Sequence, residues 1–174
     1  NIIEAFWALY KKRNIENITV IDIVKKTGYN RSTFYRYFND TQSVLDYIEN
    51  KIINSVKDIV LKRSPNTKFN QLLIEDLAKI YNLYGDYFTV LLSENGDPHF
   101  TEKFKTIVKP VFYSTIDAKI NDDLTTELIY EFTCSAVFGT FSYWSKNKKK
   151  MDINNYLEFT SNLLNNCVNI GLFK

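Results

Sequence analysis

Hydrophobic residues recur every three or four positions along most of this chain, which is the spacing of one buried face of an α-helix. Few segments alternate between apolar and polar residues, and the 5 glycines and 3 prolines are too few for a many-turned β fold. We therefore predict an all-α fold of about nine helices, with a break at Pro110. The predicted helices cover about residues 2–12, 19–27, 31–37, 41–62, 68–85, 100–108, 110–120, 124–146 and 152–172, with a separate apolar piece near 87–92.

The second and third predicted helices carry clear start and stop signals. Thr19 can cap the second helix, and Asp22 three residues later completes a capping-box pattern. Gly28 then supplies a tight turn, because glycine adopts left-handed backbone angles at least cost. Asn30 is placed as the N-cap of the third helix. Two short capped helices joined by a glycine turn are typical of a helix-turn-helix.

The third helix has two different faces. Phe34, Tyr37 and Phe38 lie three to four residues apart and can face inward, in whole or in part. The basic and hydroxyl-bearing residues left outward are Arg31, Ser32, Tyr35 and Arg36. Such a face is either solvated or meant for an external partner, and the pattern alone leaves both interpretations open.

The charge is unevenly divided along the chain. Residues 1–63 hold 11 Lys/Arg and 7 Asp/Glu, a balance of +4, whereas residues 64–174 hold 11 and 13, a balance of −2. A basic N-terminal third is compatible with binding to nucleic acid. No apolar run approaches the roughly 18 residues of a membrane span, and no signal peptide is evident, so we expect a cytoplasmic protein.

The segment from Ile18 to Leu45, "ITVIDIVKKTGYNRSTFYRYFNDTQSVL", resembles the DNA-binding domain of the TetR/AcrR family of bacterial transcriptional regulators. The matching features are the cap Thr19, the apolar pair Ile23-Val24 and the turn glycine Gly28. After them come the run Ser32–Tyr35, Phe38 and the apolar pair Val44-Leu45. The resemblance implies a DNA-binding domain over 1–48 and a helical effector-binding and dimerisation domain over 49–174. The helix at about 41–62 would connect the two.

The resemblance also implies DNA contacts. The residues at the matching positions are Thr19, Arg31, Ser32, Thr33, Tyr35, Arg36, Tyr37 and Thr41. Arg31 would meet base edges or nearby phosphates, as arginine is the usual bidentate reader of guanine. At Thr41 the family usually has a lysine that binds phosphate, so one charge-assisted contact is missing here.

The C-terminal part of the chain is rich in aromatic residues, with 18 of the 27 Phe, Tyr and Trp lying after Arg63. By resemblance, this part would bind a small, apolar or aromatic effector, and the helices at 124–146 and 152–172 would form a homodimer that reads a palindromic operator. Aromatic residues at helical spacing also fit an ordinary core. The candidate ligand residues are Tyr84, Phe88, Phe104, Phe112, Tyr113, Phe138, Phe141 and Trp144.

The sequence offers little for catalysis. The one histidine, His99, falls in a predicted turn, and neither a phosphate-binding glycine loop nor a nucleophile elbow is present. Cys134 and Cys167 are too far apart to form a metal motif. We therefore expect a protein that is not an enzyme and has no cofactor or metal. The resemblance to the TetR/AcrR family implies a ligand-responsive DNA-binding repressor. The alternative is a helical protein-interaction adaptor that keeps the head fold but binds DNA weakly or not at all.

Overall fold

The computed structural model of this chain describes residues 1–61, 69–93, 96–113, 123–147 and 150–169, and within these ranges it contains helices and no strands. The all-α prediction is confirmed, with eight α-helices and one short 3-10 helix in place of about nine. The elements are α1 Ile2–Tyr10, η1 Ile15–Asn17, α2 Val20–Thr27, α3 Arg31–Tyr35, α4 Thr41–Leu61, α5 Phe69–Leu91, α6 Pro98–Tyr113, α7 Asp123–Lys146 and α8 Ile153–Asn169. None of the described helices is long and apolar enough to span a membrane.

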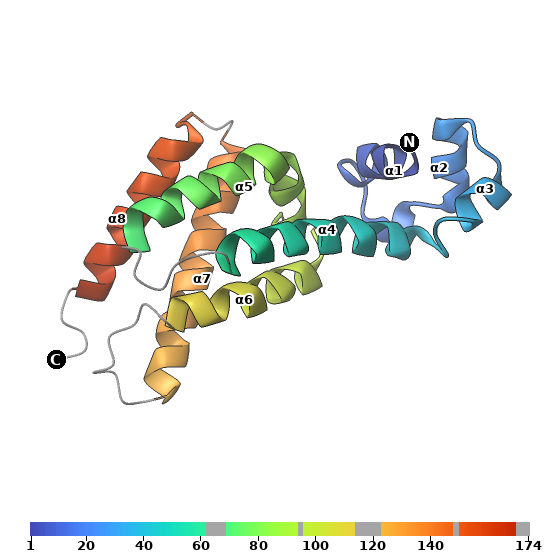
Figure 1. Cartoon of the computed structure of the whole chain (residues 1–174). Coiled ribbons are helices and arrows are strands. Elements are labelled where there is room, and N and C mark those ends of the chain that lie inside the picture. Colours follow the sequence, from blue (N-terminus) through green and yellow to red (C-terminus); the bar gives the residue numbers. More distant parts are fainter. Residues whose placement is uncertain (62–68, 94–95, 114–122, 148–149, 170–174) are drawn as a thin grey trace.

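The helices form two groups joined by one long helix. Helices α1, α2 and α3 make a small head at one end, and α5 to α8 make a larger body at the other (Figure 1). Helix α4 begins beside the head and runs into the body, where it packs along α5 and α6. Any change in how α4 lies in the body would therefore reorient the head.

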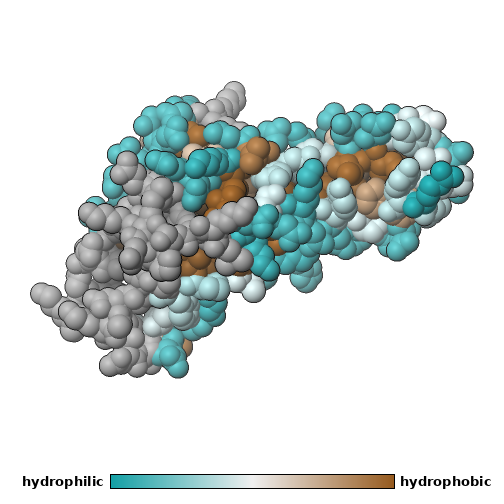
Figure 2. All heavy atoms as spheres, in the orientation of Figure 1, coloured by the Kyte–Doolittle hydropathy of each residue, from teal (hydrophilic) through white to brown (hydrophobic). Residues whose placement is uncertain are grey.

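The head is held together by apolar residues from all of its helices. Phe6 of α1, Ile23 of α2, Phe34 of α3 and Val44 of α4 are each fully buried. Figure 2 shows hydrophobic residues gathered where the head helices meet, with hydrophilic residues around them. Since each head helix is short, this shared burial supplies stability that the helices could not supply alone.

The local signals around α2 and α3 are confirmed. The Thr19 hydroxyl accepts a hydrogen bond from the Asp22 amide, and the Asp22 carboxylate accepts one from the Thr19 amide. Gly28 ends α2 with a φ of 74°, in the left-handed region that favours glycine. The Asn30 side chain caps α3. Helix α3 ends at Tyr35 and not at residue 37 as predicted, because the Tyr37 amide bonds to the Phe34 carbonyl in a tighter turn.

Two predicted interruptions in the body are wrong. Helix α5 continues through Gly85 to Leu91, and a Cβ at Gly85 would come within 2.7 Å of the Tyr81 ring. Gly85 therefore allows the Tyr81 ring to lie close to the backbone and does not end the helix. Helix α6 likewise continues through Pro110. The lost hydrogen bond is offset because Phe104, Ile107 and Val111 of the same helix pack against the core.

Several sequence predictions fall on residues outside the described ranges. These are the linker at 63–67, the later part of the predicted helix at 110–120, and the end of the predicted helix at 152–172. The remaining long helices agree with prediction to within one or two residues at the ends that are described: Thr41–Leu61, Asp123–Lys146 and the start of Ile153–Asn169.

Candidate nucleic-acid interface

The predicted contact residues of α3 and of the turn after it form one exposed surface on the head. Arg31, Ser32 and Arg36 are exposed, and Thr33 is half-buried. Tyr35 and Tyr37 are 55% and 65% exposed, which is unusual for such large rings. This surface combines charged, hydroxyl and aromatic groups, the side-chain types that contact phosphates and base edges.

The buried face of α3 fixes this surface from behind. Phe34 is fully buried, its ring meets the Tyr35 ring edge-on at 5.6 Å between centroids, and it lies 6.0 Å from the Phe38 ring. Phe38 in turn meets the Tyr47 ring of α4 at 5.9 Å. The aromatic contacts therefore tie a helix of only five residues to α4.

Asn30 organises the hydroxyl groups at the start of α3. Its Oδ1 accepts hydrogen bonds from the Thr33 amide and from the hydroxyls of Ser32 and Thr33, each at 2.8 Å. Because both hydroxyl hydrogens point back to Asn30, the lone pairs of the two oxygens remain available to an outside donor.

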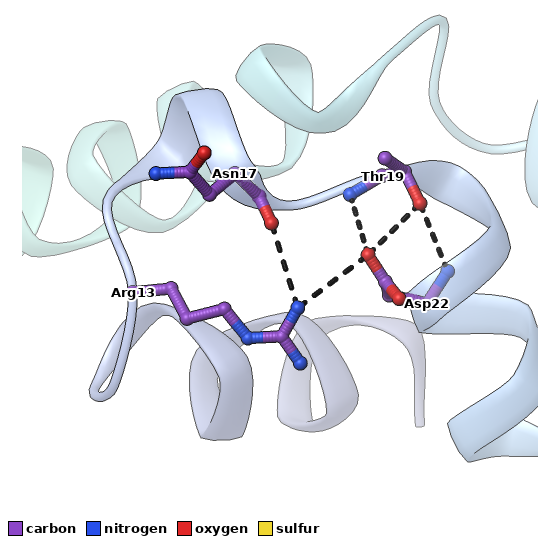
Figure 3. A network of polar contacts seen from close by, with 4 residues as sticks. All are labelled: Arg13, Asn17, Thr19 and Asp22. Carbon is purple, nitrogen blue, oxygen red and sulfur yellow. Dashed lines mark hydrogen bonds and ion pairs between the residues drawn. The ribbon is translucent and has the colours of Figure 1, made fainter.

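The hydrogen-bond donors of Thr19, at the N-terminus of α2, are already used within the chain. Both the amide and the hydroxyl of Thr19 donate to Asp22 Oδ2, at 3.0 and 2.9 Å (Figure 3). These two hydrogen bonds, the amide first, hold the pKa of Asp22 below its usual value. A phosphate at Thr19 would therefore have to compete with a fixed carboxylate for the same donors.

Arg13 supplies the positive charge at this point. Its Nη1 lies 3.7 Å from Asp22 Oδ2 and 3.5 Å from the Asn17 carbonyl oxygen (Figure 3). The Arg13 side chain is 45% exposed. Arg13 was not among the sequence candidates, because a single arginine between two helices forms no motif. Its proximity to the α2 N-terminus is visible only once α1 and α2 have packed together.

The start of α4 also carries a carboxylate beside the predicted contact residue. The Ser43 amide donates to Asp40 Oδ1 at 2.7 Å, and the Asp40 amide donates to Ser43 Oγ at 3.2 Å, so Asp40 caps α4. Thr41 is half-buried directly after it. The Asp40–Ser43 spacing is itself a capping signal that the sequence contained. Position 41 therefore lacks the lysine that the family usually has, and the Asp40 carboxylate lies next to it.

The eight aromatic ligand candidates are spread over several clusters in the body. One cluster, between α5, α6 and α7, contains Phe88, Phe104 and Phe138, with centroid distances of 5.7 and 5.9 Å. Phe141 and Trp144 lie 5.7 Å apart next to α5 and α8, and Phe112 lies 6.2 Å from Tyr113 near the end of α6. The Tyr84 hydroxyl is 2.8 Å from Ser55 Oγ. The structure therefore divides the eight candidates into one cluster of three and two pairs, with Tyr84 separate.

Comparison with known sequences covers both parts of the chain. Residues 2–48 match the sequence profile of bacterial regulatory proteins of the tetR family, and residues 71–166 match that of a transcriptional regulator C-terminal region. The chain is also 24% identical over 134 residues to the HTH-type transcriptional regulator YvdT of Bacillus subtilis (strain 168). That alignment covers 75% of this chain and 69% of YvdT.

Solved structures share the fold. A TetR transcriptional regulator from Streptococcus agalactiae 2603V has a TM-score of 0.69 at 20% identity, over 94% of this chain and 90% of its own. The fatty acid degradation regulator FadR from Bacillus halodurans has a TM-score of 0.66 at 17% identity, over 94% and 92%. FadR from Bacillus subtilis, solved in complex with stearoyl-CoA, has a TM-score of 0.62 at 16% identity, over 94% and 95%. With one profile on the head and another over more than half of the chain, this protein belongs to the TetR family of bacterial regulatory proteins and is a DNA-binding transcriptional regulator.

Proposed function

We propose that two copies of this chain bind a palindromic operator, each placing α3 in a major groove. The observation that carries the proposal is the exposed surface of α3 and its turn, in which Arg31, Ser32 and Tyr35 project from a helix anchored by the fully buried Phe34. Residues 1–48 form the DNA-binding domain in this proposal, and residues 49–174 form the effector-binding and dimerisation domain. Arg31 reads a base edge, and Arg36 and Tyr37 contact phosphates.

The dimer is proposed to form through α7 and α8, since both expose apolar residues. On α7, Leu124, Leu128, Phe132 and Tyr143 are each 59–73% exposed and lie on one face with the exposed Gly139. On α8, the exposed apolar residues are Phe159 and Leu163. Contiguous exposed apolar side chains of this size are typical of protein interfaces.

The two helices contribute to the proposed interface differently. The apolar face of α7 lies outward, whereas the apolar face of α8 lies mostly inward. On α8, Thr160 is buried and Ile153, Leu157 and Leu164 are half-buried. Helix α8 packs along α5, which accounts for its inward face. A two-fold axis through the α7 face would pair Leu124, Leu128 and Phe132 with the same stripe on the partner subunit.

The body is proposed to bind a small apolar effector among its aromatic clusters. The support is the cluster of apolar rings between α5, α6 and α7, where Phe88, Phe104 and Phe138 meet. An effector can act on DNA binding only if it binds one arrangement of the two heads better than another. Helix α4 is the element placed to transmit this preference, because it packs on the body and continues to the head.

The proposed DNA-binding mode is tested by selecting binding sites from a random duplex library with the purified protein. We expect selection to converge on a sequence with two inverted half-sites, separated centre to centre by about one helical turn or a multiple of it. Enrichment of no sequence over the starting library would contradict the proposal and favour the adaptor.

Arg31→Ala should weaken binding to the selected operator by about 1–3 kcal/mol while changing affinity for a scrambled duplex much less. The reason is that a base-reading arginine contributes mainly to the specific complex. Fluorescence anisotropy titrations on both duplexes measure the two changes. Lys57→Ala serves as the matched control, since it removes one exposed positive charge from α4 away from the head. Equal losses on both duplexes would mean that Arg31 contacts only phosphate.

Thr41→Lys should strengthen binding to every duplex and steepen the dependence of log K on log salt by up to about one unit. The added ammonium would contact a phosphate and offset the Asp40 carboxylate next to it. Titrations at several salt concentrations give the slope directly. An unchanged slope would show that position 41 lies away from the DNA backbone.

A further inference from the structure

Arg13 lies beside the first turn of α2, the helix that precedes α3 in the helix-turn-helix. It follows the end of α1, and its Nη1 lies 3.7 Å from Asp22 Oδ2 and 3.5 Å from the Asn17 carbonyl oxygen (Figure 3). In a helix-turn-helix the first helix crosses the backbone of the DNA, while the second helix enters the major groove. The end of α2 that the family resemblance places on a phosphate, through Thr19, is thus the end beside which Arg13 lies.

The capping of α2 does not depend on Arg13. Asp22 Oδ2 accepts hydrogen bonds from the Thr19 amide at 3.0 Å and from the Thr19 hydroxyl at 2.9 Å, so this carboxylate already has short partners. These two hydrogen bonds are the main causes of the lowered pKa of Asp22, and the charge of Arg13 contributes less. Arg13 is therefore a secondary partner of Asp22 and is not the group that holds it in place.

The contacts of Arg13 within the chain are long. They measure 3.7 and 3.5 Å, whereas a charge-assisted N–H···O hydrogen bond is usually about 2.7–2.9 Å. In the described part of the chain both contacts are made by Nη1, and Figure 3 shows the other terminal nitrogen pointing away from Asn17 and Asp22. The side chain is also 45% exposed. Arg13 can therefore turn to an acceptor outside the chain without breaking a short hydrogen bond.

Lysines near Arg13 are placed for other contacts. Lys11 Nζ lies 3.2 Å from Asp86 Oδ2 of α5, which directs its charge toward the body. Lys25 and Lys26 belong to the last turn of α2, whereas Arg13 lies at the first. Arg13 is therefore the cation whose ion pair lies at the first turn of α2.

Two predicted phosphate contacts of the head are weak. Position 41, at the start of α4, holds a threonine where the family usually has a lysine, and Asp40 caps the helix there. Thr19 has its amide and its hydroxyl bonded to Asp22. Contacts between cations and phosphates supply a large share of the affinity of a protein for DNA. Arg13 lies beside Thr19 and carries the positive charge that neither of these two positions supplies.

We propose that Arg13 leaves Asp22 and binds a DNA phosphate at the start of α2, supplying the charge-assisted contact that position 41 lacks. In the free head Asp22 is the internal partner of the guanidinium, so DNA binding exchanges a carboxylate for a phosphate. The contact adds affinity for any duplex and does not select a sequence. The proposal rests on the proposed function, since it requires the head to bind DNA with α2 across the backbone.

The test is a titration of the wild-type chain and of Arg13→Gln with the selected operator and with a scrambled duplex, at several salt concentrations. We expect Arg13→Gln to weaken binding to both duplexes by a similar factor, about tenfold or more at low salt. The slope of log K against log salt should become shallower by about 0.9, the value for one phosphate contact. Lys57→Gln is the matched control, because it removes an exposed positive charge from α4 away from the head. Its slope should equal that of the wild-type chain.

A second variant separates a phosphate contact from a structural role. Arg13→Lys keeps the positive charge, so it should recover most of the slope. The melting temperature of Arg13→Gln without DNA should stay within about 3 °C of wild type, because an exposed ion pair contributes little to stability.

Asp22→Asn gives an independent readout of the same exchange. It removes the carboxylate that competes with the phosphate for Arg13, so it should tighten binding to both duplexes. The gain should be smaller when it is combined with Arg13→Gln, because the competing partner is then absent.

An unchanged salt slope in Arg13→Gln would overturn the proposal and leave DNA binding by the wild-type chain intact. A loss confined to the operator would overturn it too, because Arg13 would then contact a base. So would a loss that Arg13→Lys does not recover and that accompanies a large fall in melting temperature, since Arg13 would then act by holding the connection between α1 and α2. Failure of the wild-type chain to bind either duplex would overturn the proposed function as well.

Discussion

Gly139→Arg is expected to convert the protein from a dimer to a folded monomer and to weaken operator binding by about 10²–10⁴-fold, the usual contribution of a second linked binding module. A Cβ built at Gly139 meets nothing within 4 Å, so the single chain has room for a side chain there. Arginine also favours a helix more than glycine does, by up to about 1 kcal/mol. In the proposed dimer, however, the guanidinium would enter the apolar face formed by Leu128, Phe132 and Tyr143.

Sedimentation equilibrium gives the oligomeric state of this variant, and anisotropy titration on the selected operator gives its affinity. Asn82→Arg is the matched control, because it adds the same side chain at an exposed position on α5, away from the α7 face. We expect the control to remain dimeric with unchanged affinity. A Gly139→Arg variant that stayed dimeric would place the interface elsewhere on the body.

The adjacent residues Phe34 and Tyr35 are expected to give opposite results when each is replaced by alanine. Phe34→Ala should lower the free energy of unfolding of the head by about 3–5 kcal/mol, the usual cost of removing a buried Phe ring. The ring is fully buried and contacts Tyr35 and Phe38, so its loss leaves a cavity at the centre of the head. Tyr35 is 55% exposed, so Tyr35→Ala should cost about 1 kcal/mol or less.

Among molecules that remain folded, Tyr35→Ala should reduce DNA binding more than Phe34→Ala does. Tyr35→Ala should weaken operator binding by about 1–3 kcal/mol, as expected for the loss of a direct contact. Chemical denaturation followed by circular dichroism measures stability, and anisotropy titration at low temperature measures affinity. If Tyr35→Ala bound the operator as wild type does, the tyrosine would be a surface residue without a role in recognition.

The head could be predicted from the sequence because its signals are local. The cap at Thr19, the turn at Gly28 and the cap at Asn30 each depend on residues no more than three positions away. Phe34 was expected inside and Tyr35 outside from helical spacing alone, and both lie as expected. Tyr37, which the same spacing placed inward in whole or in part, is 65% exposed, because the helix ends at Tyr35. Such features need no knowledge of tertiary contacts.

The body was less predictable because its features depend on distant contacts. Helix breaks were expected at Gly85 and Pro110, but packing of neighbouring side chains keeps both helices continuous. The ion pair between the buried Glu49 and the partly exposed Lys103 joins residues 54 positions apart, and no local sequence pattern predicts it. Arg13 reaches the α2 N-terminus for the same reason, through the packing of α1 on α2.

The central claim is that a dimer reads two half-sites with α3. It is tested most directly by titrating the wild-type protein against three duplexes: the selected palindrome, the palindrome with one half-site scrambled, and a fully scrambled control. We predict two chains per palindrome, much weaker binding to the single half-site, and a log K that falls linearly with log salt by about 0.9 per phosphate contacted. Equal affinity for all three duplexes, or one chain per palindrome at saturation, would contradict the account.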